Sequence, residues 1–363
     1  MSETAAAPGR ASPLSRIALA VYVLLTAYAS LYPLGGWIQH GSSPWEFLFA
    51  HWPRYISGVD MAINVLGYMP LGLFAVAALY PRLRGAAAFA VATLASAALS
   101  IALEAAQTYL PSRDASNLDV LCNTAGAALG AALGLGLVPW MLHDGPLKRF
   151  RNAAFLPGAD IDAGLVLVAL WVFAQLNPAM LLFGTGILRD LLVAQEGRAR
   201  APEFFVLVET LTSAANLVAL GLLLSGLVVP GRPARAIFVA LLALALAVKT
   251  AAFGLLMRAD SILSWLTPGA QLGLIGGLAI ALAAFGLPRT ARLSLAAALL
   301  MAGAVLVNLA PPNPYFAVTL KLWHQGHFLN FNGLTRLVSS VWPFVATAYL
   351  IYLAARRGRE PVS

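Results

Sequence analysis

The chain carries very little charge for its length, since Asp, Glu, Lys and Arg together make up 10% of its 363 residues. Soluble domains carry about 25% charged residues, which they need to cover their surface. Hydrophobic residues make up 60% of this chain, and long stretches of Ala, Leu, Val and Gly recur throughout it. The composition therefore excludes a soluble globular protein and indicates an integral membrane protein.

Cysteine is almost absent, because Cys122 is the single one in the sequence. A disulfide within the chain and a cysteine-based metal site are both excluded. His324 and His327 are three residues apart, but no Cys, Asp or Glu stands near them to complete a metal shell. The sequence also lacks a phosphate-cradling GxxxxGK[ST] loop and a nucleophile elbow. We therefore expect no metal and no cofactor, and the sequence gives little support for an enzyme.

The apolar residues fall into ten segments, each near the roughly 20 residues that a helix needs to cross a bilayer. The fold class we predict is accordingly all-α, a multi-pass membrane protein with about ten transmembrane helices. The predicted spans are 15–34, 61–80, 86–110, 120–141, 160–182, 205–229, 236–257, 269–287, 293–310 and 337–355.

The basic residues indicate the orientation of these helices, because cytoplasmic loops hold an excess of Lys and Arg. With both termini in the cytoplasm, most of the basic residues lie on that side, so the net charge of +8 reads as an orientation signal. Nothing in this charge calls for nucleic acid as a partner. Ala27, Tyr28 and Ala29 resemble a signal-peptide cleavage site, but apolar sequence continues beyond them, so we expect an uncleaved first helix.

Three stretches of the first half align in order with stretches of the second half. ASLYP at 29–33 matches AQLNP at 174–178, 60–81 matches 209–230, and 103–116 matches 248–261. Colinear matches predict a duplicated unit of four helices, with the two copies parallel to each other. The predicted organisation is a tail at 1–14, a first unit at 15–142, a linker at 143–158, a degenerate second unit at 159–287, and two further helices with a basic tail at 288–363.

Polar residues that are costly inside a membrane gather at corresponding ends of three helices in the first unit. The predicted topology brings all of them to the non-cytoplasmic face of the membrane, where Arg113 would compensate the charge of the three carboxylates. The set comprises Asp60 and Asn64 on one helix, Glu104 and Gln107 on the next, Arg113 in the following loop, and Asp119 and Asn123 on the helix after it.

This polar set has three interpretations. It lines a site for a lipid ligand, it is an enzyme site in which Glu104 acts as general acid or base, or it is an interhelical hydrogen-bond network without a ligand. Asp119 taken alone also suits a helix cap.

Two further sets of residues have structural interpretations. The small-residue repeat of Gly126, Gly130 and Gly134 predicts close helix packing. In the second copy, Glu209 and Lys249 are predicted to form a buried ion pair. The stretches 45–52 and 186–195 suit short helices lying along the membrane surface. The tryptophans of the outer loops suit an aromatic belt at the bilayer interface, namely Trp37, Trp45, Trp52, Trp265, Trp323 and Trp342.

The order and spacing of these residues resemble those of the VanZ-like family of bacterial membrane proteins. The likeness rests on Pro70-Leu71-Gly72 after Asp60 and Asn64, on Glu104-x-x-Gln107, on Arg113, and on Asp119-x-x-x-Asn123-x-x-Gly126-x-x-x-Gly130. It covers residues 17–140. The resemblance implies a four-helix unit in the bacterial inner membrane, a role in the cell envelope and, for some members, lowered sensitivity to glycopeptide antibiotics.

With this resemblance, we expect a protein that binds or moves an envelope lipid, or a lipid-linked cell-wall or glycan intermediate, at an outward-facing polar cavity. The expected partner is therefore a membrane lipid of this kind. A membrane enzyme that acts on a lipid headgroup, or a membrane assembly factor without catalytic activity, remains the alternative.

Overall fold

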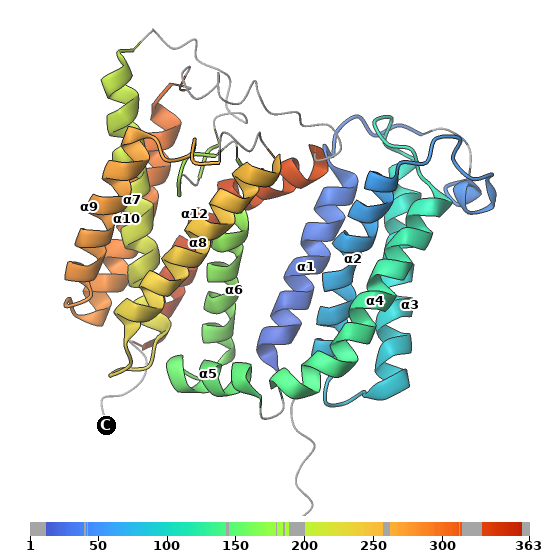
Figure 1. The fold of residues 1–363 in the computed structure, drawn as a ribbon, viewed down its shortest axis with the longest axis horizontal. Helices are drawn as coiled ribbons and strands as arrows, with labels where there is room; N and C mark the ends of the chain where they lie inside the picture. Colours follow the sequence, from blue (N-terminus) through green and yellow to red (C-terminus); the bar gives the residue numbers. More distant parts are fainter. Residues whose placement is uncertain are drawn as a thin grey trace, which may run out of the picture. The chain divides into compact units, whose positions relative to one another are not determined.

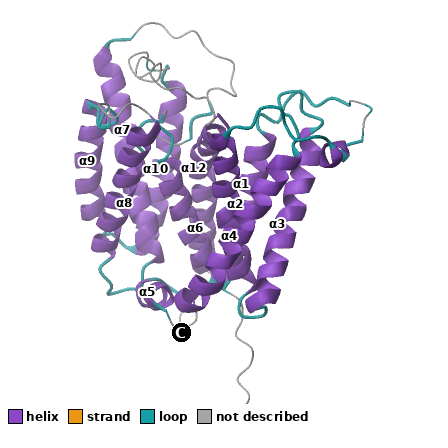
Figure 2. Cartoon of the chain, turned by 45° about the vertical axis from the view of Figure 1, so that its right-hand side comes forward, coloured by secondary structure: helices purple, strands orange, loops and turns teal. Residues whose placement is uncertain are grey.

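The structure, a computed structural model, is helical over the part of the chain that it describes (Figures 1 and 2). That part runs from residue 12 to residue 357 except for 40, 42, 143–144, 179, 184–185, 189–199, 257–261, 312 and 314–328. It contains eleven α-helices, one short 3-10 helix and no β-strand within these limits, apart from one isolated bridge between Phe155 and Val228. The all-α class predicted from composition is confirmed.

Eight helices in the described part of the chain are long and apolar enough to cross a membrane. The protein is therefore a multi-pass membrane protein. The eight are α1 (Pro13–Leu31), α2 (Gly58–Leu79), α3 (Gly85–Gln107), α4 (Asn117–Leu142), α7 (Pro202–Leu227), α8 (Ala234–Leu256), α10 (Arg289–Leu309) and α12 (Leu329–Arg357).

Two of the ten predicted spans contain shorter helices, so the expected number of full-length spans is too high for the described residues. Helix α6 (Ala159–Ala174) has 16 residues, and α9 (Pro268–Ala284) has 17. At 1.5 Å per residue, α6 extends about 24 Å, less than the roughly 30 Å of a hydrocarbon core. The prediction carried α6 on to residue 182, but the residue before Pro178 is pushed out of the helical region, and the helix has already ended.

The chain divides into two compact units. Unit 1 comprises residues 1–153 and 327–334, and unit 2 comprises 154–326 and 335–363. The first boundary falls inside the predicted linker, where the structure has a further short helix, α5 (Pro146–Ala154). The 3-10 helix η1 (Glu46–Phe49) lies in the predicted surface stretch 45–52, whereas most of the stretch 186–195 and both His324 and His327 lie outside the described residues.

In unit 1, α2 and α4 approach each other with their backbones in contact. A Cβ atom at Gly126 would collide with the carbonyl of Val65, and one at Gly130 would collide with the carbonyl of Met69. Gly134, one turn further along, faces the side chain of Val76. Small residues at these positions let the two helices pack more closely than larger side chains allow. The same close packing brings the polar residues near the beginning of α4 against those of α2.

In unit 2, α7 is the central helix and packs against α9 and α10. Its inner face is apolar, with Leu217, Leu220 and Leu223 fully buried. Glycines of α9 again lie at the contact, since a Cβ atom at Gly277 would come within 2.9 Å of the Cα of Ala214. Each unit thus has a central pair of helices in which glycine sets the separation.

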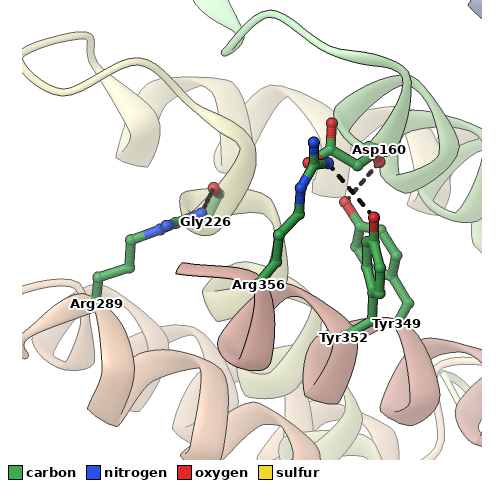
Figure 3. Close-up of polar contacts among 6 residues, drawn as sticks. All are labelled: Asp160, Gly226, Arg289, Tyr349, Tyr352 and Arg356. Carbon is green, nitrogen blue, oxygen red and sulfur yellow. Dashed lines mark hydrogen bonds and ion pairs between the residues drawn. The ribbon is translucent and has the colours of Figure 1, made fainter. Parts of the chain in front are cut away.

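Polar contacts join four helix ends within unit 2 (Figure 3). Arg356, near the end of α12, forms an ion pair of 2.9 Å with Asp160 at the beginning of α6. The hydroxyl of Tyr349 donates to the backbone carbonyl of Asp160, also at 2.9 Å, and Arg289 of α10 donates to the carbonyl of Gly226 near the end of α7. Because Arg356 is 56% exposed, its ion pair positions the two helices more than it stabilises them.

The backbone contact between α2 and α4 gives a direct test of the packing. We expect Gly130→Ala to lower the stability of the purified protein by about 1–3 kcal/mol, because its Cβ atom has no room beside the carbonyl of Met69. Gly136→Ala is the matched control on the same helix, since nothing lies within 4 Å of its Cβ position. Thermal unfolding in detergent compares the two, and equal melting temperatures would contradict the close approach.

Candidate functional site

The seven polar residues predicted in the first half all lie in unit 1, near the beginning of α2, the end of α3 and the beginning of α4. Charge interactions connect Asp60 with Asp119 and Glu104 with both Asp119 and Arg113. The chain brings them together because α2 and α4 begin at the end of the unit where α3 finishes. We call this set, Asp60, Asn64, Glu104, Gln107, Arg113, Asp119 and Asn123, the polar cluster. On which side of the membrane it lies stays a prediction.

Two members of the polar cluster hold the end of α1. The side-chain nitrogen of Gln107 donates to the carbonyl of Ser30 at 2.9 Å. The Arg113 guanidinium donates twice to the carbonyl of Tyr32, at 3.0 Å from Nε and 2.6 Å from Nη2. The last carbonyls of a helix have no partner within it, so these donors satisfy groups that water does not reach easily near a membrane.

Arg113 lies in the loop between α3 and α4 and is half-buried. Desolvation lowers the pKa of its guanidinium, and the nearby Glu104 carboxylate opposes this shift. An arginine pKa is so high that the side chain keeps its charge despite this. Arg113 therefore supplies a permanent positive charge at the centre of the loop.

Glu104 holds the beginning of α4. Its Oε2 accepts the backbone N–H of Ser116 at 2.9 Å, and the side chain is only 4% exposed. Ser116 in turn caps α4, because its hydroxyl oxygen accepts the N–H of Leu118 at 3.1 Å. A carboxylate near the first turn of a helix is stabilised by the helix dipole. The cap considered for Asp119 thus belongs to Ser116.

Asp119 faces α2 instead. Its Oδ1 accepts a hydrogen bond of 2.8 Å from the side-chain nitrogen of Asn64. Both residues are partly exposed, and Asp60, one turn before Asn64, lies exposed at the beginning of α2. The N–H of Asp60 donates to the hydroxyl of Ser57, the residue that caps α2. These residues form the part of the cluster that is accessible from outside the bundle.

Beneath them lies a buried polar centre. Asn123 donates from its side chain to the hydroxyl oxygen of Ser100 at 2.9 Å. Among the described residues, neither Oδ1 of Asn123 nor the hydroxyl of Tyr68 has a hydrogen-bond partner, although both side chains are at least nine-tenths buried. The Tyr68 hydroxyl lies close to the side chains of Ser100 and Ser30, without a well-aligned hydrogen bond to either, and within electrostatic range of Glu104 and Asp119.

Sequence reasoning missed Tyr68 and Ser100, although both carry the signal that identified the others. Tyr68 follows Asn64 by four residues, and Ser100 precedes Glu104 by four, so each lies on the same helix face as a predicted residue. Serine and tyrosine are common in apolar helices and attract less notice than charged residues. Their spacing alone would have found them.

The polar cluster therefore has two parts. The anchoring part, Glu104, Gln107 and Arg113, is bound to backbone groups of α1 and α4. The open part consists of Asn64 and Asp119, which are one turn nearer to the beginning of α2 and α4 than Tyr68 and Asn123. Asp60 lies exposed beside it, at the beginning of α2. No group of three or more His, Cys, Asp and Glu side chains that suits a metal ion occurs in the part of the chain that the structure describes.

In unit 2, Lys249 is completely buried in α8. Its ammonium donates to the carbonyls of Asn177 and Met180, at 2.7 and 2.8 Å, and lies 5.6 Å from the ring centre of Phe253. Glu209, which is also buried, attracts the same ammonium through its charge. The backbone carbonyls are thus the direct partners of Lys249, and its pairing with Glu209 stays a prediction.

The bonds of Arg113 to α1 lead to a prediction about stability. We expect Arg113→Met to lower the free energy of unfolding by about 1–3 kcal/mol, because the Tyr32 carbonyl loses both donors. Arg54→Met, which removes an exposed arginine from the segment before α2, is the control and should have little effect. Thermal unfolding in detergent measures both, and an unchanged melting temperature for Arg113→Met would show that the contact contributes nothing.

The pairing of Glu209 with Lys249 predicts coupled stability effects. We expect Lys249→Met and Glu209→Gln to destabilise the protein singly, since each leaves the other charge buried. The double variant should then be more stable than the sum of the single losses by about 0.5–3 kcal/mol. Melting temperatures of the three variants complete the cycle, and strictly additive losses would argue that the two charges do not interact.

Comparison with known proteins finds a family match over the part of the chain that holds the polar cluster. A family model described as VanZ/LLP1 matches residues 17–138, about a third of the chain. The matched segment contains all seven cluster residues and the glycines that set the separation of α2 and α4. No curated protein and no solved structure matches the chain. The resemblance drawn from the sequence is confirmed, and residues 17–138 of this protein are similar to the VanZ/LLP1 family.

Proposed function

We propose that unit 1 binds the polar headgroup of an envelope lipid, or of a lipid-linked cell-wall or glycan intermediate, at the open part of the polar cluster. The observation that carries this proposal is a pair of buried polar atoms that form no well-aligned hydrogen bond in the described part of the chain, the Tyr68 hydroxyl and Oδ1 of Asn123. A buried polar group left without a hydrogen bond costs about 1–3 kcal/mol. A ligand headgroup that bonds to these atoms would offset that cost.

The position of the cluster supports a lipid as the ligand. Asp119 lies in the first turn of α4 and Asp60 in the first turn of α2, so both are at the ends of candidate membrane spans. The headgroups of a bilayer lie at this level, directly outside the hydrocarbon core. Asn64 fixes one carboxylate oxygen of Asp119, which leaves the carboxylate oriented toward a donor such as a hydroxyl or an ammonium group.

The anchoring part of the cluster supports binding more than catalysis. Glu104 would be the general acid or base of an enzyme, but its carboxylate is buried and accepts the N–H of Ser116. A group used in this way orients α4 and does not face a substrate. We therefore propose a binding protein without catalytic activity at this cluster. If the bound lipid is a cell-wall intermediate, altered sensitivity to glycopeptide antibiotics would be the expected phenotype.

Two conservative variants test this proposal with opposite expected outcomes. Tyr68→Phe removes a hydroxyl that forms no well-aligned hydrogen bond in the described structure, so stability should change little. The enrichment of a specific envelope lipid in the purified protein should fall about fivefold, the equivalent of one hydrogen bond of about 1 kcal/mol. Mass spectrometry of the lipids that copurify, compared with the bulk membrane, measures this change.

Tyr22→Phe is the matched control. The Tyr22 hydroxyl donates to the carbonyl of Gly67 at 2.8 Å, so its loss should reduce stability and leave the bound lipid unchanged. Glu104→Gln tests the enzyme alternative. An enzyme that used Glu104 as its general acid or base would lose its activity in this variant. Binding is overturned if no envelope lipid is enriched in the wild-type protein, or if Tyr68→Phe retains the full enrichment.

A further inference from the structure

Residues 34–57, which connect α1 to α2, form a segment that we call the aromatic loop. Figure 2 shows it beyond the end of α1, with the short helix η1 within it. Eight large apolar side chains in this loop are exposed, and the most exposed are Phe49 at 89% and Tyr55 at 95%. The eight are Leu34, Trp37, Ile38, Trp45, Phe49, Trp52, Tyr55 and Ile56.

Hydrogen bonds hold the backbone of this loop against unit 1. The N–H of Ile38 donates to the carbonyl of Tyr109 at 2.9 Å, and the side chain of Asn117 donates to the carbonyl of Ala50 at 2.7 Å. Phe47, which belongs to the loop, has a buried side chain. The exposed side chains therefore belong to a loop that is attached at several points, and their exposure is a property of its outer surface.

Exposing the apolar surface of eight large side chains to water is unfavourable, by about 25 cal/mol for each Å² of that surface. Both ends of the loop continue into candidate membrane spans. Asn117, the first residue of a third candidate span, α4, is hydrogen-bonded to Ala50 within the loop. The lateral surfaces of these spans are also apolar and exposed, for example at Leu66, Leu94 and Leu121. The exposed apolar surface of the loop therefore continues the exposed apolar surface of the candidate spans. The loop lies at the ends of these spans, where a hydrocarbon core around them would end.

We propose that the aromatic loop lies in the interfacial layer of the bilayer, with its aromatic rings among the headgroups and the upper part of the acyl chains. Trp and Tyr favour this layer because the ring is apolar and the N–H or O–H reaches water. The loop then fixes the depth of the polar cluster, since Asn117 is two residues before Asp119. This inference concerns the loop alone and does not depend on the proposed lipid ligand.

Site-directed fluorescence in reconstituted bilayers tests the position of the loop. Cys122 is the only cysteine, so Cys122→Ala gives a background in which a single new cysteine is labelled. Phe49→Cys and Tyr55→Cys report on the loop at two independent positions. Leu94→Cys, in the exposed middle of α3, is the reference inside the hydrocarbon core, and the unattached dye in the aqueous phase is the aqueous reference.

Each labelled protein is mixed with lipids that carry a nitroxide quencher, either next to the headgroup or near the end of the acyl chain. Labels at 49 and 55 should be quenched most by the headgroup-proximal nitroxide and little by aqueous iodide. The label at 94 should be quenched most by the nitroxide near the chain end, and the unattached dye mainly by iodide.

The proposal is overturned if the labels at 49 and 55 behave like the unattached dye. It is also overturned if both quenchers fail and the labels become accessible on dilution of the protein in lipid, because a second copy of the chain would then cover the loop. Retention of the envelope lipid by the same preparations is measured separately. A lost lipid with an interfacial loop would contradict the proposed function and leave this inference intact.

Discussion

The structure of this protein depends on satisfying backbone carbonyls at helix ends that lie in or near a membrane. Water does not reach such carbonyls easily, so side chains donate hydrogen bonds to them. In unit 1, Arg113 and Gln107 donate to the last carbonyls of α1. In unit 2, Lys249 donates to the carbonyls of Asn177 and Met180, directly after α6. Each unit therefore uses a cation from its interior or its loop to bind backbone carbonyls just beyond the end of a helix.

These two arrangements bear on the predicted repeat, which stays a prediction. The sequence aligns ASLYP at 29–33 with AQLNP at 174–178, so that Tyr32 corresponds to Asn177. The carbonyls of these two residues are the ones that Arg113 and Lys249 bind. The same alignment places Glu104 opposite Lys249. The two side chains have opposite charge, so they bind different backbone groups. A carboxylate binds the N–H at the beginning of a helix, and an ammonium binds the carbonyls after the end of one.

The polar cluster illustrates how one set of residues serves structure and a proposed function together. Glu104, Gln107 and Arg113 are the charged and amide groups that a sequence motif shows most clearly, yet each of them hydrogen-bonds to a backbone group on another segment. Less conspicuous residues, Tyr68 and Asn123, hold the atoms without partners. The anchoring residues fix the beginning of α4, and this beginning carries Asp119. The rigid part of the site therefore supports the part that we propose binds a ligand.

The sequence by itself determined the membrane class, the helical positions and the residues of the polar cluster, because apolar length and helical spacing are local properties. It overestimated α6, since a helix end depends on the chain that follows it. Only the tertiary structure decided which cluster residue contacts which, for the partners of Glu104, Arg113 and Lys249 are backbone groups on other segments. Backbone N–H and C=O groups occur at every residue, so no sequence pattern distinguishes the ones that a side chain will bind. Their identity follows from how close the helices pack, and glycines such as Gly126 and Gly130 set that separation in unit 1.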